Sequence, residues 1–449
     1  MKRRSVVFMI LGLLMITAGC TGTQTKTDSA VIEIPEIAYD YYELDNGLKI
    51  YVVEDHAVPL VKFEIWYNVG SIDEPERISG ISHMLEHTMF LGTESLGKDK
   101  VHHLTKQVGG WANAGTYYDF TMYEEELPSA KLELAMAIEA DRMRNLKIDP
   151  EEFGREQQVV AQERRMRMEN NFFMSSMEEI QAAAFTEHPL HHSIIGWMES
   201  IHNYTVDDMR AYYMQYYAPN NAVITVSGDV DSKEVFAMAR KYFGSYEPQD
   251  VTRLGVTEPD QTEERFLKLE KETQVPLIGM IYKIPEGDHE DIVALEALNA
   301  VLVNNATSRI NSVLKNEKKM IMQAGSFLLS VRDPGYLFVF LIPMSVDSME
   351  SVKDSFDAEI TRLIQEGVTE EELAAVKKSV LKSRIFSLKS KGSFASLLAI
   401  NTLRFDNPGL YKEQYESLSH LTGEDIKDAA EKYLVSTKRT VGFVVPEGK

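Results

Sequence analysis

The stretch His83-Met84-Leu85-Glu86-His87 is the most informative part of this sequence. His83 and His87 are four residues apart, so both fall on one face of a helix, with Glu86 beside them. Imidazoles at that spacing can share one zinc ion, and the glutamate can act on the water at that ion. The alternative is a surface helix with two unrelated histidines. A third ligand would decide, because catalytic zinc keeps three protein ligands and one open position.

Residues 150–169 predict a second helix that offers such a ligand. Pro150 suits the first turn of a helix, and the acidic residues just behind it are favoured there by the helix dipole. Glu156 and Glu163 fall two turns apart on one face of this helix. Most helical glutamates are only solvated, so position alone assigns neither residue to a metal.

The spacing of these residues resembles that of the pitrilysin/insulinase family of zinc peptidases, in the bacterial branch related to mitochondrial processing peptidase. That family carries H-x-x-E-H and a glutamate ligand about 76 positions later, which is Glu163 here. A further family glutamate, seven residues before that ligand, is Glu156. The resemblance implies one zinc ion per chain, bound by His83, His87 and Glu163. It also implies that Glu86 is the general base and that Glu156 supports the ligands from behind.

Other stretches resemble the family in the same order along the chain. Residues 113–116, Asn-Ala-Gly-Thr, resemble its substrate-binding edge strand, which implies that Asn113 and Ala114 hold the substrate. An extended peptide would add a strand to that edge, so its backbone is recognised with little regard for its side chains. Residues 46–53, 188–196 and 221–229 also match, so the resemblance covers nearly all of the mature chain.

The second part of the chain repeats the first without its metal ligands. Pro59-Leu60-Val61 introduces the strand before the zinc helix, and Pro276-Leu277-Ile278 introduces a similar strand 217 positions later. The same shift replaces the two histidines and the glutamate of the motif by Ala300, Val303 and Asn304. Residues 247–264 contain two prolines, a glycine and many acids, which is typical of a linker.

We therefore expect an α+β protein with two homologous α/β-sandwich domains of the mitochondrial processing peptidase type. The expected division is a signal peptide (1–19), a lipid-anchor tether (20–33), an N-terminal zinc-binding peptidase domain (34–246), a linker (247–264) and a C-terminal inactive repeat domain (265–449).

The N-terminus resembles a bacterial lipoprotein signal. Lys2-Arg3-Arg4 precedes an apolar run too short for a stable membrane span, and that run ends at Thr17-Ala18-Gly19-Cys20. Cys20 is the only cysteine, and its position favours cleavage before it and a lipid on it; an ordinary secretory signal or a retained anchor is the alternative. The expected location is the bacterial cell envelope, lipid-anchored on the periplasmic side, with the outer membrane preferred.

One departure from the family pattern concerns partners. Self-sufficient members carry an Arg and a Tyr, seven residues apart, that help to hold the scissile carbonyl and its developing charge. Lys315 and Met322 occupy those positions here, and a methionine cannot donate a hydrogen bond. This predicts a heterodimer with a zinc-less homologous subunit that supplies the Arg/Tyr pair.

The predicted function is that of a zinc-dependent endopeptidase acting on peptides or unfolded protein segments. The net charge of −22 argues against a nucleic-acid partner, which requires basic surfaces. Two other classes are a non-catalytic binding or assembly subunit, which the intact motif opposes, and a zinc-storage lipoprotein, which usually shows His-rich tracts. The methionine-rich run from Met166 to Met177 is interpreted as core packing or a loose cover rather than as the lining of a substrate chamber.

Overall fold

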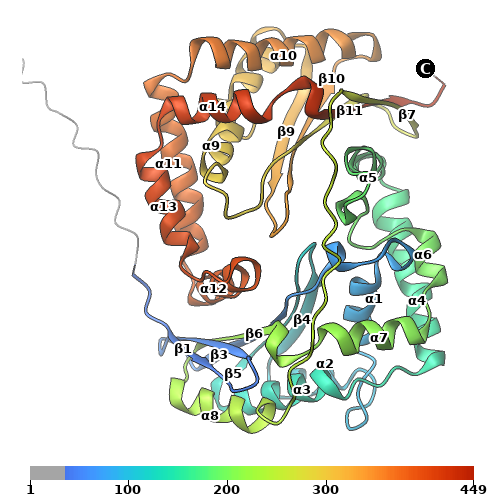
Figure 1. The fold of residues 1–449 in the computed structure, drawn as a ribbon, viewed down its shortest axis with the longest axis vertical. Helices are drawn as coiled ribbons and strands as arrows, with labels where there is room; N and C mark the ends of the chain where they lie inside the picture. Colours follow the sequence, from blue (N-terminus) through green and yellow to red (C-terminus); the bar gives the residue numbers. More distant parts are fainter. Residues whose placement is uncertain (1–35, 449) are drawn as a thin grey trace, which may run out of the picture. The chain divides into compact units, whose positions relative to one another are not determined.

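The computed structural model of the protein describes residues 36–448 (Figure 1). The expected signal peptide and Cys20 lie outside the described residues. Within this described range, no helix has both the length and the apolar character that crossing a membrane requires.

The first repeat is built on a mixed six-stranded sheet with the order β1-β2-β6-β3-β5-β4. β2 and β6 run parallel, and the other neighbours are antiparallel. β6 lies inside the sheet, and its β-branched sequence is buried nearly throughout, as a strand covered on both faces requires. The strands are β1 (Asp40–Glu43), β2 (Lys49–Glu54), β3 (Leu60–Tyr67), β4 (Trp111–Thr116), β5 (Thr121–Pro128) and β6 (Ala222–Gly228).

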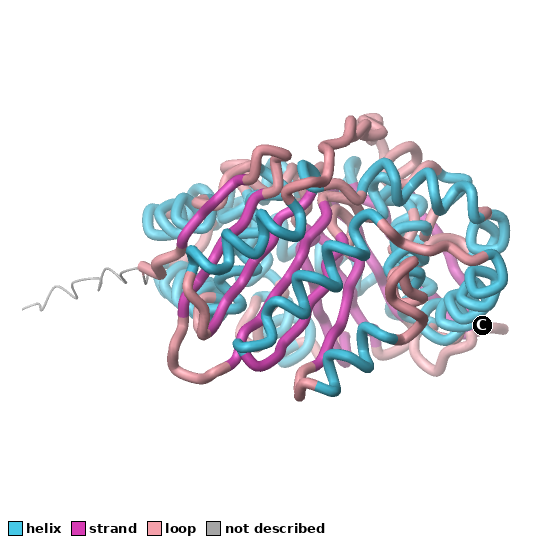
Figure 2. Tube along the Cα trace, turned by 90° about the horizontal axis from the view of Figure 1, so that it is seen from below, coloured by secondary structure: helices cyan, strands magenta, loops and turns pink. Residues whose placement is uncertain are grey.

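Helices α3 and α8 pack on this sheet through contacts with β3, β5 and β2. Seen from below, helices lie across the strands (Figure 2). The helices of this repeat are α1 (Ile81–Thr88), α2 (Lys100–Gln107), α3 (Leu132–Arg144), α4 (Pro150–Arg164), α5 (Phe172–Ala184), α6 (Met198–Asn203), α7 (Val206–Tyr216) and α8 (Ser232–Phe243).

The second repeat has a five-stranded sheet with the order β7-β11-β8-β10-β9. Only β7 and β11 run parallel, so order and direction match those of β2-β6-β3-β5-β4 in the first sheet. This correspondence confirms the predicted α+β fold with two homologous repeats. The strands are β7 (Arg265–Lys271), β8 (Leu277–Lys283), β9 (Ile321–Leu329), β10 (Tyr336–Pro343) and β11 (Arg439–Pro446).

The remaining helices follow the second set of strands or lie between them. They are α9 (Ile292–Leu302), α10 (Met349–Glu366), α11 (Glu370–Ser387), α12 (Lys391–Phe405), α13 (Leu410–His420) and α14 (Gly423–Tyr433). Between α8 and β7, which begins at Arg265, the chain forms neither helix nor strand.

The shift of 217 positions holds for the strands but not for the helix after them. β3 begins at Leu60 and β8 at Leu277, whereas α9 ends at Leu302, before two of the three shifted positions. The loop before α9 is shorter than the loop before α1, which explains the difference. Matched at their helix starts, the motif positions hold Ala294, Ala297 and Leu298, and none of these side chains can bind a metal.

One helix of each repeat packs on the sheet of the other repeat. α12, from the second repeat, contacts β6, β2 and β3, whereas α5, from the first, contacts β11, β8 and β7 (Figure 1). Buried ion pairs also join the two repeats. The guanidinium of Arg332 donates to Asp73 at 2.5 Å, and Arg404 pairs with Asp119 at 2.7 Å. Because Asp73 and Asp119 are almost fully buried, the halves are joined by pairs that are costly to break.

Candidate metal centre

Helix α1, which carries the motif, begins at a left-handed glycine, Gly80. The buried carboxylate of Glu74 accepts hydrogen bonds from the backbone amides of Gly80, at 2.5 Å, and Ser82, at 2.7 Å. Amides in the first turn of a helix have no partner within the helix, so Glu74 supplies one. Burial raises the pKa of Glu74 to about 8, although both amides oppose that shift. The start of α1 is thus fixed from inside the fold.

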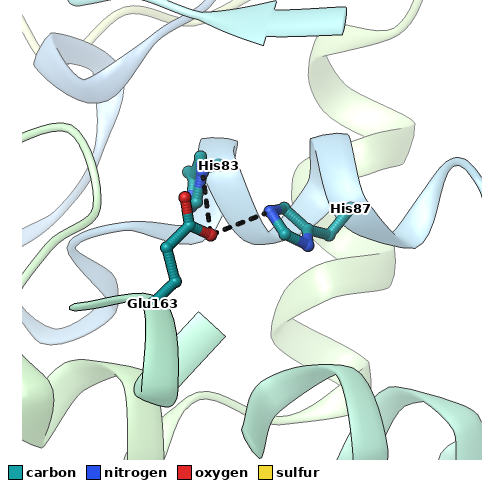
Figure 3. A group of neighbouring side chains, drawn as sticks. All are labelled: His83, His87 and Glu163. Carbon is teal, nitrogen blue, oxygen red and sulfur yellow. Dashed lines mark ion pairs between the residues drawn. The ribbon is translucent and has the colours of Figure 1, made fainter. Parts of the chain in front are cut away.

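Helix α4 brings the glutamates to the motif. The side chain of Asp149 accepts from the amides of Glu151 and Glu152, and Pro150 occupies the first turn, as the sequence predicts. α4 packs against α1. Glu163 lies near the C-terminal end of α4 and projects toward both histidines (Figure 3).

Three groups converge as the resemblance implies. Glu163 Oε2 lies 3.9 Å from His83 Nε2 and 3.4 Å from His87 Nε2 (Figure 3). One ligand atom from each of these residues lies within 4.8 Å of the others. Ligand atoms around a tetrahedral zinc lie about 3.3 Å apart, so only small side-chain movements would let them share the ion.

The electrostatic surroundings of the two histidines also favour a bound cation, and His87 must lose its proton before it can bind one. Burial, with His87 nearby, lowers the pKa of His83 to about 4, so its imidazole is neutral, as metal binding requires. Its Nδ1 is buried without a hydrogen-bond partner among the described residues. Burial would also lower the pKa of His87, but hydrogen bonds to Glu156 and Glu163 raise it to about 9. The carboxylates therefore favour a positive charge at this point.

Glu156 lies behind the ligands, as the resemblance implies. Its Oε1 is 2.8 Å from His87 Nδ1. That bond turns the other ring nitrogen, Nε2, toward Glu163. A carboxylate behind a histidine ligand fixes both the tautomer and the orientation of the ring.

Glu86 lies beside the ligands and not among them. Thr116 Oγ1 donates a 2.7 Å hydrogen bond to Glu86 Oε2. Burial raises the pKa of Glu86, against the opposing effect of that hydrogen bond. The sequence placed Thr116 in the edge strand but did not predict its contact with Glu86, because that contact depends on how β4 lies against α1.

β4 is the last strand of the first sheet and pairs only with β5 among the described strands. Its residues Asn113 and Ala114, together with Thr116, line the same cavity as the metal-binding residues. An edge strand with free backbone groups can accept an extended peptide.

The cavity has a volume of about 1050 Å³, and both charged and apolar side chains line it. Four methionines contribute to its apolar lining: Met166, Met168, Met174 and Met177. They lie on a π-helical segment, Arg165–Glu169, and on α5. The predicted core packing is confirmed for Met168, Met174 and Met177, which belong to or pack against hydrophobic core clusters, and the same side chains also line the cavity.

Lys315 and Met322, which the resemblance assigns to the positions of the family's Arg/Tyr pair, lie outside the cavity. Lys315 is exposed on a π-helical segment, Asn311–Glu317, and Met322 is 40% exposed on β9. Neither is among the described residues that line the cavity.

Two family profiles match this chain. Residues 49–197 match the profile described as insulinase (peptidase family M16), and residues 203–380 match the profile described as peptidase M16 inactive domain. The metal-binding motif falls in the first match, and the repeat without metal ligands falls largely in the second.

Several bacterial proteases resemble the chain over most of its length. Zinc protease PqqE of Helicobacter pylori is 31% identical over 409 residues, which is 90% of this chain and 92% of that protein. The uncharacterized zinc protease YmxG of Bacillus subtilis is 26% identical over 91% of this chain and 98% of its own. The probable zinc protease PqqL of Escherichia coli is 27% identical over 76% of this chain and 38% of that protein.

Solved structures agree with the sequence relatives. The crystal structure of a protease from Helicobacter pylori has a TM-score of 0.85 at 29% identity, over 92% of this chain and all of that one. The first half of the periplasmic protease PqqL from Escherichia coli shares the fold, with a TM-score of 0.75 at 23% identity over 91% and 92% of the two chains. The chain therefore belongs to the pitrilysin/insulinase family of zinc metallopeptidases, peptidase family M16.

Proposed function

We propose that the chain is a zinc-dependent endopeptidase that binds one zinc ion and cleaves peptides or unfolded protein segments in the cell envelope. The observation that carries the proposal is the convergence of His83, His87 and Glu163 beside Glu86 at the wall of one large cavity. Zinc-storage proteins need no general base and no cavity of peptide size, so this arrangement favours catalysis over storage.

Different residues of the chain would bind the metal, transfer the proton and position the base. A zinc ion bound by the three ligands would polarise the scissile carbonyl and lower the pKa of water. Glu86 would accept the proton of the attacking water and pass it to the leaving amine. Its pKa, raised by burial, suits a group that must take up and release a proton near neutral pH. The Thr116 hydroxyl holds this carboxylate beside β4, where the substrate backbone would lie.

The side chains that line the cavity favour one class of substrate, extended segments with bulky apolar residues. The four methionines make part of the cavity lining apolar and deformable, because a thioether chain adapts its rotamers to different shapes. Backbone pairing at β4 adds no sequence preference. We therefore expect cleavage beside bulky apolar residues, in segments extended enough to reach the edge strand.

Location and anchoring belong to the same proposal. The relative PqqL of Escherichia coli is named a periplasmic protease, and the predicted signal ending at Cys20 supports a lipid-anchored, periplasm-facing protein, preferably at the outer membrane. Cys20→Ser should leave the protein unprocessed or release it from the membrane fraction. Wild-type protein recovered only from the cytoplasm would contradict this part of the proposal.

The partner is a further part of the proposal. A zinc-less homologous subunit with an Arg/Tyr pair would complete the site, since Lys315 and Met322 replace those donors here and lie outside the cavity. The chain would then be the zinc-bearing half of a heterodimer.

Metal analysis combined with peptide cleavage tests the assignment. His83→Ala, His87→Ala and Glu163→Gln should each lose zinc. Glu86→Gln should keep one zinc per chain and lose cleavage by about 100–10,000-fold, the usual contribution of general acid–base catalysis. Full zinc content without either histidine would contradict the ligand assignment. Zinc binding without any cleavage, alone or with a partner, would instead favour the non-catalytic assembly subunit.

A further inference from the structure

We propose that the buried pair Arg164–Glu178 positions the metal ligand Glu163, and that α5 connects this pair to the sheet of the second repeat. The inference rests on the proposed zinc site and deepens it, because it gives the repeat without metal ligands a part in zinc binding. Arg164 and Glu178 are positioning residues, since neither is a ligand.

Arg164 follows Glu163 directly and is the last residue of α4. Its guanidinium donates two parallel hydrogen bonds to the carboxylate of Glu178, both at 2.9 Å, and a third to the carbonyl of Gly196 at 2.6 Å. The Ser193 hydroxyl donates to the same carboxylate at 2.5 Å. A bidentate pair of this kind fixes direction as well as distance. The end of α4 is therefore held from the side, at the residue next to the ligand.

The helix needs such a support at this point. Directly after Arg164 the chain winds as a π-helix over residues 165–169 and then turns into α5. Wide π-turns are less regular than α-helix and occur often at functional sites. Without a lateral contact, the last turn of α4 would have more freedom, and Glu163 would move with it. The Glu178 carboxylate, which also lines the cavity, closes the turn by linking α5 back to α4.

The same contact reaches the helix that carries the histidines. Gly196, whose carbonyl accepts from Arg164, packs against Gly80 at the start of α1. Both glycines have positive φ, 74° and 90°, and a Cβ on either one would overlap the backbone of the other segment. Only glycine permits this approach. Arg164 therefore connects α4 to the start of α1, so the two helices that supply the ligands share one buried support.

α5 in turn rests on the second sheet. The side chain of Ile180, one helical half-turn beyond Glu178, is fully buried. It lies over Gly279 of β8 and Gly442 of β11, which are paired across the two strands. A Cβ on Gly279 would come within 2.6 Å of Ile180 Cδ1, and one on Gly442 would overlap Ile180. The two glycines form a socket for Ile180, so the second sheet sets where α5 lies.

Two carboxylate variants test the inference. Glu178→Gln keeps the shape of the side chain and removes its charge. The control is Glu372→Gln in the second repeat, where Glu372 makes a similar bidentate pair with Arg309 at 2.7 and 2.8 Å. We measure the zinc dissociation constant by chelator competition and the thermal unfolding of the metal-free proteins. Glu178→Gln should weaken zinc binding about 10-fold, as loss of a ligand's supporting contacts does, whereas Glu372→Gln should leave it unchanged.

The unfolding data separate positioning from general stabilisation. Both variants lose a bidentate ion pair, so both metal-free proteins should unfold at lowered temperatures, with the smaller drop in Glu372→Gln, whose side chain is 29% exposed. Only the positioning role predicts that zinc affinity falls in one variant alone. Equal zinc affinity in wild type and folded Glu178→Gln overturns the inference while leaving the proposed function intact. A wild-type chain without zinc affinity overturns the proposed function, and the inference with it.

A steric variant provides the second route, should Glu178→Gln fail to fold. Gly442→Ala fills the socket and should displace α5. A substitution in the second repeat should thereby weaken zinc binding in the first repeat several-fold. Combining it with Ile180→Ala makes room for the new methyl and should recover part of the lost affinity. Unchanged zinc binding in Gly442→Ala, or no recovery in the double variant, overturns the connection between the second sheet and the metal centre.

Discussion

α1 and α9 occupy the same place in the two repeats, after the corresponding strands β3 and β8, but they are used differently. α9 is buried along its whole length except for Glu296, and its side chains are almost all apolar. α1 keeps an apolar face toward the core, whereas His83, Glu86 and His87 are only partly buried and face the cavity. The two helices show that the repeated topology does not determine the chemistry, which depends on the few side chains placed on it.

The neighbours of each helix account for the difference. α9 is covered by α11, α13 and α14, and all of its residues except Glu296 are buried. α1 instead contacts α4 and α7 and the edge strand β4, which places glutamates and free backbone groups around the motif. In the first repeat the motif helix lies beside a cavity, and in the second the corresponding helix lies in a core. Experiments on either helix should therefore affect different properties.

The largest expected effect tests the proposed heterodimer. On the proposal that Lys315 and Met322 replace the family's Arg and Tyr, the isolated chain should bind zinc yet cleave peptides about 100–1000-fold more slowly than the complete enzyme, the usual cost of losing an oxyanion donor. Adding a zinc-less homologue with the Arg/Tyr pair should restore cleavage. The measurement is peptide hydrolysis by the chain, the homologue and their mixture.

Two controls limit the interpretation of that assay. Glu86→Gln mixed with the same homologue should stay inactive, which would show that the zinc-bearing chain performs the reaction. Co-purification of the two chains should follow restored activity. Rapid turnover by the single chain, with no gain on mixing, would show that the site is complete in a monomer or homodimer.

The next effect tests the core role of α9. Leu298 is fully buried in α9, so Leu298→Ala should destabilise the protein by about 2–5 kcal/mol through lost burial and a residual cavity. Thermal unfolding measures that cost. Zinc content below the new melting temperature should not change, because Leu298 lies in the repeat that carries no ligands. Loss of zinc in the folded variant would argue against a purely structural α9.

Sequence patterns predicted those features that depend on local spacing. His83, Glu86 and His87 share a helix face because of helical periodicity, and the start of α4 follows from Asp149 and Pro150. The duplication was visible because similar residues, Pro59-Leu60 and Pro276-Leu277, stand at the start of corresponding strands. These features need no knowledge of how distant segments pack.

The features that sequence reasoning missed depend on contacts between distant segments. Thr116 meets Glu86 across the gap between β4 and α1, and Arg164 meets Glu178 across a π-turn. α9 begins where the sequence predicted a helix, after Asp291, but the residues equivalent to the motif were misassigned because a shift between strands does not record the length of the loop that follows. The methionines both pack in the core and line the cavity, and the sequence pattern predicted only the packing.

A smaller effect, a gain in the stability of the metal-free chain, is expected at the metal centre. His83 Nδ1 is buried without a partner among the described residues, so the metal-free site carries an unsatisfied polar atom. His83→Leu should abolish zinc binding and stabilise the metal-free chain by about 1 kcal/mol. His87→Leu should give no such gain, because it leaves Glu156 without its hydrogen-bond partner. Denaturant unfolding of both variants after chelation distinguishes these outcomes, and a destabilised His83→Leu would contradict the argument.

The smallest effect concerns Glu258, which connects the segment between the repeats to both of them. Its carboxylate accepts from the amides of Thr186, Glu187 and His188 in the first repeat, and it pairs with Lys283 of β8 at 2.9 Å. Partial burial alone would raise the pKa of Glu258, but these partners lower it to about 2. A carboxylate whose pKa is lower in the folded state stabilises the fold above its unfolded pKa and loses that contribution as the pH falls.

Glu258→Gln should therefore cost about 1 kcal/mol near neutral pH, since the amide keeps an acceptor and loses the charge. The difference from wild type should shrink below about pH 4.5, where the unfolded carboxylate takes up its proton, and should vanish toward about pH 2. Denaturant midpoints from about pH 7 to about pH 2 measure the slope. Glu263→Gln is the matched control, because Glu263 is exposed in the same segment and should change neither midpoint nor slope. A difference between Glu258→Gln and wild type that stays constant with pH would mean that the charge of Glu258 does not hold the repeats together, and that the exchanged helices α5 and α12 carry that role.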